Sequence, residues 1–205
     1  MLRRLALMVV LVAGASFAAA APVHAAGDDD VVGDLLRDDR WLIESFDVAA
    51  EVTGDGDLLV TETLQVDFAS LERRGILRDI PVRYDVPPDP WYDLDGREPD
   101  DLQRVIEVDD LEVSSDTAPD DLDVEQPGPL GGEWLQLRIG DEDQTITGAH
   151  TYTISYRVRG ALDQIDGQPE LFWNATGNDW PVIIDRASVT MTGGDPIETA
   201  CFVGG

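Results

Sequence analysis

The sequence predicts an all-β protein, folded as an antiparallel β-sandwich with two long acidic loops. Three observations support this fold class. Apolar and polar residues alternate along many short runs, which is the pattern of a strand with one buried face. Segments rich in Pro, Gly and Asp separate these runs. No window carries a helical apolar stripe longer than about two turns.

The clearest element is a hairpin near the start of the domain. In "SFDVAAEVT" every second residue from Phe46 to Val52 is apolar, so these side chains share one face. The next four residues, "GDGD" at Gly54 to Asp57, have the composition of a tight turn. Alternation resumes from Leu58 to Phe68, which predicts the second strand.

Further strands follow along the rest of the chain. They are predicted at Arg78 to Tyr84, Arg104 to Val113, Trp134 to Ile139, Thr145 to Val158, Leu171 to Asn174 and Val182 to Met191. Seven or more short strands are typical of a sandwich. The two inserts, Asp85 to Asp101 and Ser114 to Glu133, are predicted to be mobile acidic surface loops.

The first 25 residues have the pattern of an export signal. Arg3 and Arg4 precede an apolar run from Leu5 to Ala21, and small residues before Ala26 form a cleavage site. We therefore divide the chain into a signal peptide at 1–25, an acidic linker at 26–40 and a β-sandwich domain at 41–205. The product is expected to be exported and extracytoplasmic.

The charge of the mature chain argues against two classes of partner, nucleic acids and anionic lipids. Without Arg3 and Arg4, twelve of the 14 basic residues remain against 42 acidic ones, a net charge near -30. Such a charge repels nucleic acid and anionic lipid headgroups. It favours cations, basic partners or plain solubility.

Glu62 breaks the pattern of its strand. It lies in phase with the apolar face of Leu58 to Phe68, where an unpaired carboxylate would cost several kcal/mol. We therefore expect a partner from the nearby cluster of Arg73, Arg74 and Arg78, with Arg78 making a bidentate contact. The alternative, a catalytic carboxylate, requires a second acid or base in a cleft.

A cluster of aromatic and polar residues follows near the end of the chain. It contains Trp173, Asn174, Asn178, Asp179 and Trp180. One interpretation is a structural corner that closes the end of the sandwich. The other is an exposed stacking surface for a glycan.

Two blocks of sequence resemble a known family. "RRGILRDIPVRY" from Arg73 and "ELFWNATGNDWPVIIDRASVTM" from Glu170, together with the leader and Glu62, look like the extracytoplasmic N-terminal domain of bacterial predicted membrane proteins, domain of unknown function 2207. The resemblance covers Trp41 to Gly205. It implies a domain that transmembrane helices usually follow, so we expect this chain to be truncated before its membrane anchor.

The resemblance also bears on Cys201. In the family a second cysteine follows within a few residues, so Cys201 is a candidate for a disulfide whose partner lies beyond this chain. A free thiol and an intermolecular bridge are the alternatives. Truncation explains the missing cysteine and the missing anchor together.

No cofactor is expected, and metal binding is a minor alternative. Carboxylates gather at Asp55 to Asp57, Asp93 to Gly96 and Gly140 to Asp143, as calcium would require, but none of these runs continues to the glutamate that completes a helical calcium loop. His150 is the only histidine after the leader, which argues against zinc.

These observations favour a non-catalytic extracytoplasmic domain of a cell-envelope membrane protein, with a binding or assembly role and an unknown envelope component or membrane protein as its partner. Two alternatives remain. One is a secreted carbohydrate-binding module that uses Trp173 and Trp180. The other is a glycosidase or peptidase that uses Glu62 and Asp185.

Overall fold

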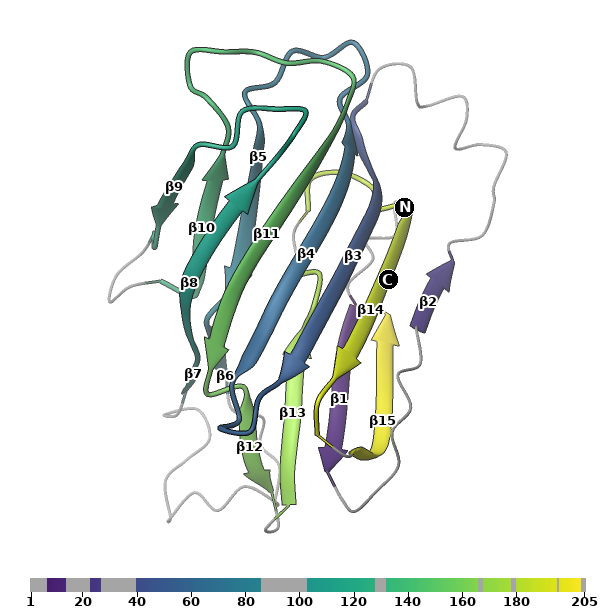
Figure 1. Cartoon of the computed structure of the whole chain (residues 1–205), viewed down its shortest axis with the longest axis vertical. Helices are drawn as coiled ribbons and strands as arrows, with labels where there is room; N and C mark the ends of the chain where they lie inside the picture. The colour runs from purple at the N-terminus through teal and green to yellow at the C-terminus, as the bar shows by residue number, and fades with distance from the viewer. Residues whose placement is uncertain are drawn as a thin grey trace.

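The computed structural model of the chain contains strands and no helix in the part that it describes (Figure 1). That part comprises residues 7–13, 23–26, 40–85, 103–127, 132–165, 168–177, 180–194 and 196–203. The all-β prediction is therefore confirmed. Within these residues no helix is long and apolar enough to cross a membrane.

The largest sheet has six strands in the order β2-β14-β3-β4-β11-β8. Their bounds are β2 Val23–Ala26, β14 Arg186–Thr192, β3 Leu42–Val52, β4 Leu58–Asp67, β11 Ala149–Arg159 and β8 Glu107–Ser114. The predicted hairpin is present as β3 and β4, and the backbone N–H of Thr53 donates to the carbonyl of Asp57 at 2.8 Å across the turn. One pair departs from the antiparallel pattern, because β14 runs parallel to β3.

Two smaller sheets and a short pair complete the fold. The three-stranded sheet has the order β5-β10-β9, with bounds Ile76–Pro81, Trp134–Ile139 and Leu122–Glu125. The four-stranded sheet has the order β12-β13-β1-β15, with bounds Leu162–Ile165, Gln168–Asn174, Leu7–Ala13 and Pro196–Val203. Strands β6 Arg83–Asp85 and β7 Gln103–Val105 pair with each other.

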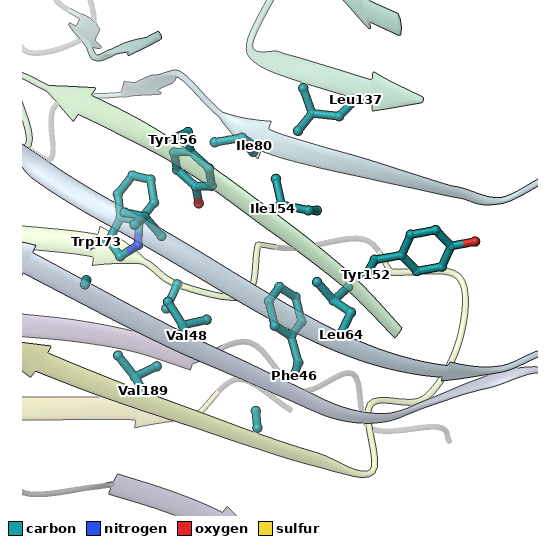
Figure 2. Packing of buried hydrophobic residues seen from close by; sticks show 14 of the residues in the cluster. Phe46, Val48, Leu64, Ile80, Leu137, Tyr152, Ile154, Tyr156, Trp173 and Val189 are labelled. Atoms are coloured by element: carbon teal, nitrogen blue, oxygen red, sulfur yellow. The ribbon is translucent and has the colours of Figure 1, made fainter. Parts of the chain in front are cut away.

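The core lies where the smaller sheets pack against the inner face of the six-stranded sheet (Figure 2). The alternation in β4 buries Leu58, Val60, Glu62, Leu64 and Val66 on one face, while the residues at odd positions from 59 to 65 lie on the other face. Contacts across the layers include Tyr156 of β11 against Trp173 of β13, with ring centroids 6.3 Å apart. Side chains from strands far apart in the sequence thus pack together in the core.

The two predicted loops have different outcomes. The second, Ser114 to Glu133, was predicted to be a mobile surface loop, and this is wrong for its middle, where β9 pairs with β10. Leu122 lies opposite Ile139 and Val124 opposite Leu137, so two apolar residues within an acidic stretch join the sheet. Of the first insert, only Asp85 is described, at the end of β6, and 86–101 lie outside the described residues.

Two facing glycines, one before β5 and one after β10, allow the backbones of these two strands to approach closely at one end of the three-stranded sheet. Gly75 and Gly140 have φ values of +127° and +134°, and a Cβ on Gly75 would lie 1.8 Å from the carbonyl oxygen of Ile139. That oxygen belongs to the backbone of β10, so it can move aside only if the strand shifts. Only glycine fits this position without strain.

Gly75→Ala is therefore expected to lower the free energy of unfolding by about 2 kcal/mol or more, because strain at a positive φ adds to a backbone clash. Urea denaturation measures the loss. Gly54→Ala is the matched control, since no atom lies within 4 Å of its added Cβ, and its change should stay within about 0.5 kcal/mol. Equal losses in the two variants would contradict the close approach.

Candidate functional site

The candidate site is a buried cluster formed by Glu62 of β4, Arg78 of β5 and Tyr156 of β11. In register, Glu62 lies between Val48 of β3 and Ile154 of β11, so it occupies the inner face of the largest sheet. Arg78 lies opposite the buried Leu137, which directs it inward from the facing layer. The side chains of Glu62 and Arg78 have no solvent exposure.

Arg78 holds the Glu62 carboxylate with two parallel hydrogen bonds. Its Nε donates to Oε2 at 2.8 Å and its Nη2 donates to Oε1 at 2.7 Å. The Tyr156 hydroxyl donates a third hydrogen bond to Oε1 at 2.5 Å. Three donors therefore compensate the desolvation of one buried carboxylate. Of the arginines named from the sequence, Arg78 makes this contact, whereas the side chains of Arg73 and Arg74 are exposed.

The Arg78 guanidinium also contacts two backbone carbonyls, one of them in the turn that follows β13. Nη2 also donates to the carbonyl of Ala175 at 3.3 Å, and Nη1 donates to the carbonyl of Asp79 at 2.6 Å. The guanidinium carbon lies 5.4 Å from the ring centroid of Phe46 and 5.9 Å from that of Trp180, distances at which a cation and a ring attract. Arg78 thus joins the two sequence blocks that carry the family resemblance.

The turn after β13 is organised by its own side chains. The amide of Asn174 accepts a hydrogen bond from the backbone N–H of Gly177 at 3.0 Å, and the Trp180 indole donates to the carbonyl of Thr176 at 2.8 Å. Gly177 has φ +74°, and a Cβ there would lie 2.4 Å from Nη1 of Arg78. A side chain at position 177 would therefore clash with the Arg78 guanidinium, so this turn requires glycine there.

Of the two interpretations of Trp173 and Trp180, the alternative of an exposed glycan platform is wrong for these two residues. Trp173 is 1% exposed and Trp180 is 7% exposed, because both pack in the core, and Asn174 is 8% exposed. Asn178 and Asp179 lie outside the described residues. Buried rings have no free face for a sugar, so the arrangement is that of a structural corner.

The ionisation of the cluster follows from its burial. Desolvation alone would lower the pKa of Arg78, but the charge and hydrogen bonds of Glu62 outweigh it, so the pKa is raised above its ordinary value. Burial, with the Glu62 carboxylate beside it, raises the pKa of Tyr156 well above 10. Arg78 therefore stays a cation beside Glu62, and Tyr156 stays a neutral phenol.

Two further tyrosines also resist ionisation. Burial raises the pKa of both Tyr84 and Tyr152 to about 12. An unfolded chain releases these protons near pH 10. Between these values the unfolded state binds fewer protons than the folded state, so stability should fall as the pH rises above about 10.

Tyr152→Phe isolates one part of this effect. The Tyr152 hydroxyl has no hydrogen-bond partner among the described residues, so the variant should match the wild type within about 0.5 kcal/mol at pH 7. Chemical denaturation from pH 8 to pH 11 should then show a shallower loss of stability for the variant. Parallel curves would contradict the raised pKa of this tyrosine.

In two of the acidic runs considered for calcium, a carboxylate contacts other groups of the protein. The carboxylate of Asp57 contacts Arg157 at 3.2 Å and Arg159 at 3.8 Å. Asp141 accepts a hydrogen bond from the backbone N–H of Asp143 at 2.8 Å and so shapes its own turn. Asp93 to Gly96 lies outside the described residues. No group of three His, Cys, Asp or Glu side chains in the described part is arranged to hold a metal ion.

The remaining sequence-predicted residues lie apart from the cluster. Asp185 is exposed, and its backbone N–H donates to the carbonyl of Ile43. Cys201 lies in β15 opposite Val9 of β1, and its side chain is outside the described part. Tyr156 was not predicted from the sequence. It lies two residues after Ile154, the residue opposite Glu62, so the alternation of β11 could have indicated that Tyr156 shares the face of Glu62.

Comparison with family models gives a match that spans most of the predicted domain. Residues 42–199 match the N-terminal domain of a predicted membrane protein, DUF2207. The chain belongs to the DUF2207 family. The match includes Glu62, Arg78, Tyr156 and the turn around Trp180, so the whole buried cluster lies within the DUF2207 domain.

Other comparisons add little to this assignment. No curated protein matches the chain. Native leukotriene A4 hydrolase from Saccharomyces cerevisiae is 12% identical, with a TM-score of 0.33, over 58% of this chain and 15% of the enzyme. The yeast enzyme in complex with bestatin is 14% identical, with a TM-score of 0.32, over 57% of this chain and 14% of the enzyme. Similarity at this level carries no argument about fold or activity.

Proposed function

We propose that this DUF2207 domain is the extracytoplasmic, non-catalytic part of a cell-envelope membrane protein and that it acts by binding or assembly. The observation that carries the proposal is the family match over residues 42–199 to a domain described as N-terminal in a predicted membrane protein. An apolar run followed by small residues, the pattern that predicts an export signal, precedes the matched region. Together they favour a domain displayed outside the cytoplasm.

The buried cluster supports a structural role for its charged residues. Glu62 is fully enclosed, and its two oxygens accept hydrogen bonds from Arg78 and Tyr156. Asp185 is exposed, whereas Glu62 is fully buried. Either enzyme would need Glu62 to reach its substrate, and most glycosidases use two carboxylates that flank the bond to be cleaved, so this pair does not favour the glycosidase or peptidase alternative.

The proposal is tested by following the product of the native gene with a tag placed after the domain. We expect the mature protein to begin at Ala26, to fractionate with the envelope and to be cleaved by protease added outside the cytoplasmic membrane. Val10→Asp is the matched control, because a charge in the apolar run should block export. A cytoplasmic product that retains Met1 would overturn the proposal.

A further inference from the structure

Strand β1 occupies an interior position in the four-stranded sheet. It pairs antiparallel with β13, from Met8 opposite Asn174 to Val12 opposite Glu170, and antiparallel with β15, from Leu7 opposite Val203 to Ala13 opposite Pro196. Figure 1 shows β1 between these two strands. Yet Leu7–Ala13 belongs to the apolar run of the predicted signal peptide, which cleavage removes.

Removal of β1 leaves a gap that is one strand wide. Because β13 and β15 both run antiparallel to β1, they run parallel to each other. Their backbones are then separated by two strand spacings, about 9.5 Å, which is too far for hydrogen bonds between them. Each strand would present unpaired backbone N–H and C=O groups to the gap, and an unpaired strand edge is a template for another strand.

Separate anchors hold the two sides of the gap in place. On β13, Leu171 and Trp173 are both 1% exposed and are fixed in the core. On the other side, β15 follows β14, which is paired in register with β3. The connection approaches β3 closely at Gly193, where a Cβ would lie 2.1 Å from the carbonyl oxygen of Val52. Closure of the gap would disturb one of these anchors.

We propose that the gap between β13 and β15, the acceptor slot, is a strand-binding site of the exported domain. Its ligand is a predominantly apolar, extended segment of about seven residues, donated by another polypeptide of the envelope and running antiparallel to both strands. Leu7–Ala13, "LMVVLVA", shows the chemistry that the slot accepts. Backbone hydrogen bonds supply the affinity in this mode of recognition, and alternate side chains supply the selectivity.

The register adds a preference at one end of the acceptor slot. Val12 lies opposite Glu170 on β13 and opposite Glu198 on β15. Opposite charges at directly opposed positions of neighbouring strands stabilise their pairing. A donor strand with a basic residue at the position of Val12 should therefore bind more tightly than the all-apolar segment, and added salt should reduce the difference.

The test uses the processed chain, which begins at Ala26, and a synthetic peptide of residues 6–14 with an uncharged solubilising tail. At saturation the peptide should bind one to one and raise the melting temperature by about 5 °C or more. A peptide with Val10→Pro lacks one backbone donor in the middle of the strand and should bind at least about tenfold more weakly. The full 205-residue chain, whose slot is filled, should not respond.

The thiol of Cys201 gives an independent test of the register. Cys201 lies opposite Val9 and next to Ala200, which lies opposite Val10. With oxidised glutathione as the oxidant, a peptide carrying Val9→Cys should form a disulfide with Cys201, because opposed Cα atoms are close enough for one. A peptide carrying Val10→Cys is the control and should react far less.

Hydrogen exchange separates the outcomes. The peptide should newly protect backbone amides in residues 170–174 and 196–203. If these amides are already protected without it, the two sides have closed or the chain has filled the slot itself, and the proposal is overturned. Equal binding of the Val10→Pro peptide would also overturn it. If the processed chain is unfolded alone, the peptide should restore folding, and failure to do so counts against the slot.

This inference rests on export and cleavage as proposed above, but its test uses purified protein. A domain that is found in the envelope yet binds no strand would retain the proposed function and lose the slot. A domain that binds the strand but is never exported would show the reverse.

Discussion

Arg78→Met is expected to lower the free energy of unfolding by about 3–5 kcal/mol, because the substitution leaves the Glu62 carboxylate buried without its counter-charge. Methionine retains much of the apolar stem, so the loss reports the guanidinium more than the volume. The Tyr156 hydroxyl remains as a donor to Oε1 but carries no charge. Denaturant unfolding at pH 7, followed by tryptophan fluorescence, measures the difference.

An exposed arginine nearby provides the control for the effect of burial. Arg74→Met changes the same residue type four positions earlier, where the side chain is exposed, and should cost less than about 0.5 kcal/mol. Glu62→Gln in the wild type should cost about 3 kcal/mol or more, whereas in the Arg78→Met background it should cost much less, since the unpaired charge is then removed. Strictly additive losses would contradict direct coupling between the two side chains.

Trp173→Ala should produce a loss of similar size, about 3–5 kcal/mol, because a large, fully buried side chain leaves a cavity between the layers. The Trp173 indole N–H has no hydrogen-bond partner among the described residues, so the loss reports packing against Tyr156 and its neighbours. Thermal and urea unfolding both measure it. Trp173→Phe should recover part of the stability.

Trp134→Ala is the matched control for this substitution. Trp134 lies in β10 with 41% of its surface exposed, so its removal should cost less than about 1 kcal/mol. A small loss at Trp173 together with a large loss at Trp134 would contradict the assignment of Trp173 to the core.

Local pattern was sufficient to predict most individual strands. Alternation in the sequence placed the β3–β4 hairpin and gave β10 its observed bounds, Trp134–Ile139. The Glu62 partner was also predictable, because a carboxylate on an apolar face requires a counter-charge and arginines stand close in sequence. These inferences need only neighbouring residues and a buried face.

Features that depend on distant residues were not predictable in this way. Nothing in the local pattern of Arg186–Thr192 indicates that it pairs parallel to β3. Strand β9 is short and acidic, and it forms because β10 is available beside it. Tyr156 resembles any aromatic core residue until Glu62 is placed within reach of its hydroxyl. The burial of Trp173 and Trp180 likewise follows from the opposing layer and not from their own segment.

The pairing of β14 with β3 also bears on the order in which the chain folds. Arg186 and Glu44 are in contact although 142 positions separate them. Hairpin β3–β4 can form as soon as it is synthesised, but one edge of β3 must wait for nearly the whole domain to emerge. Such non-local pairing slows folding and leaves an open edge exposed to other chains in the meantime. A chaperone that keeps the nascent chain extended until residue 192 has been made would therefore protect the domain at its most vulnerable stage.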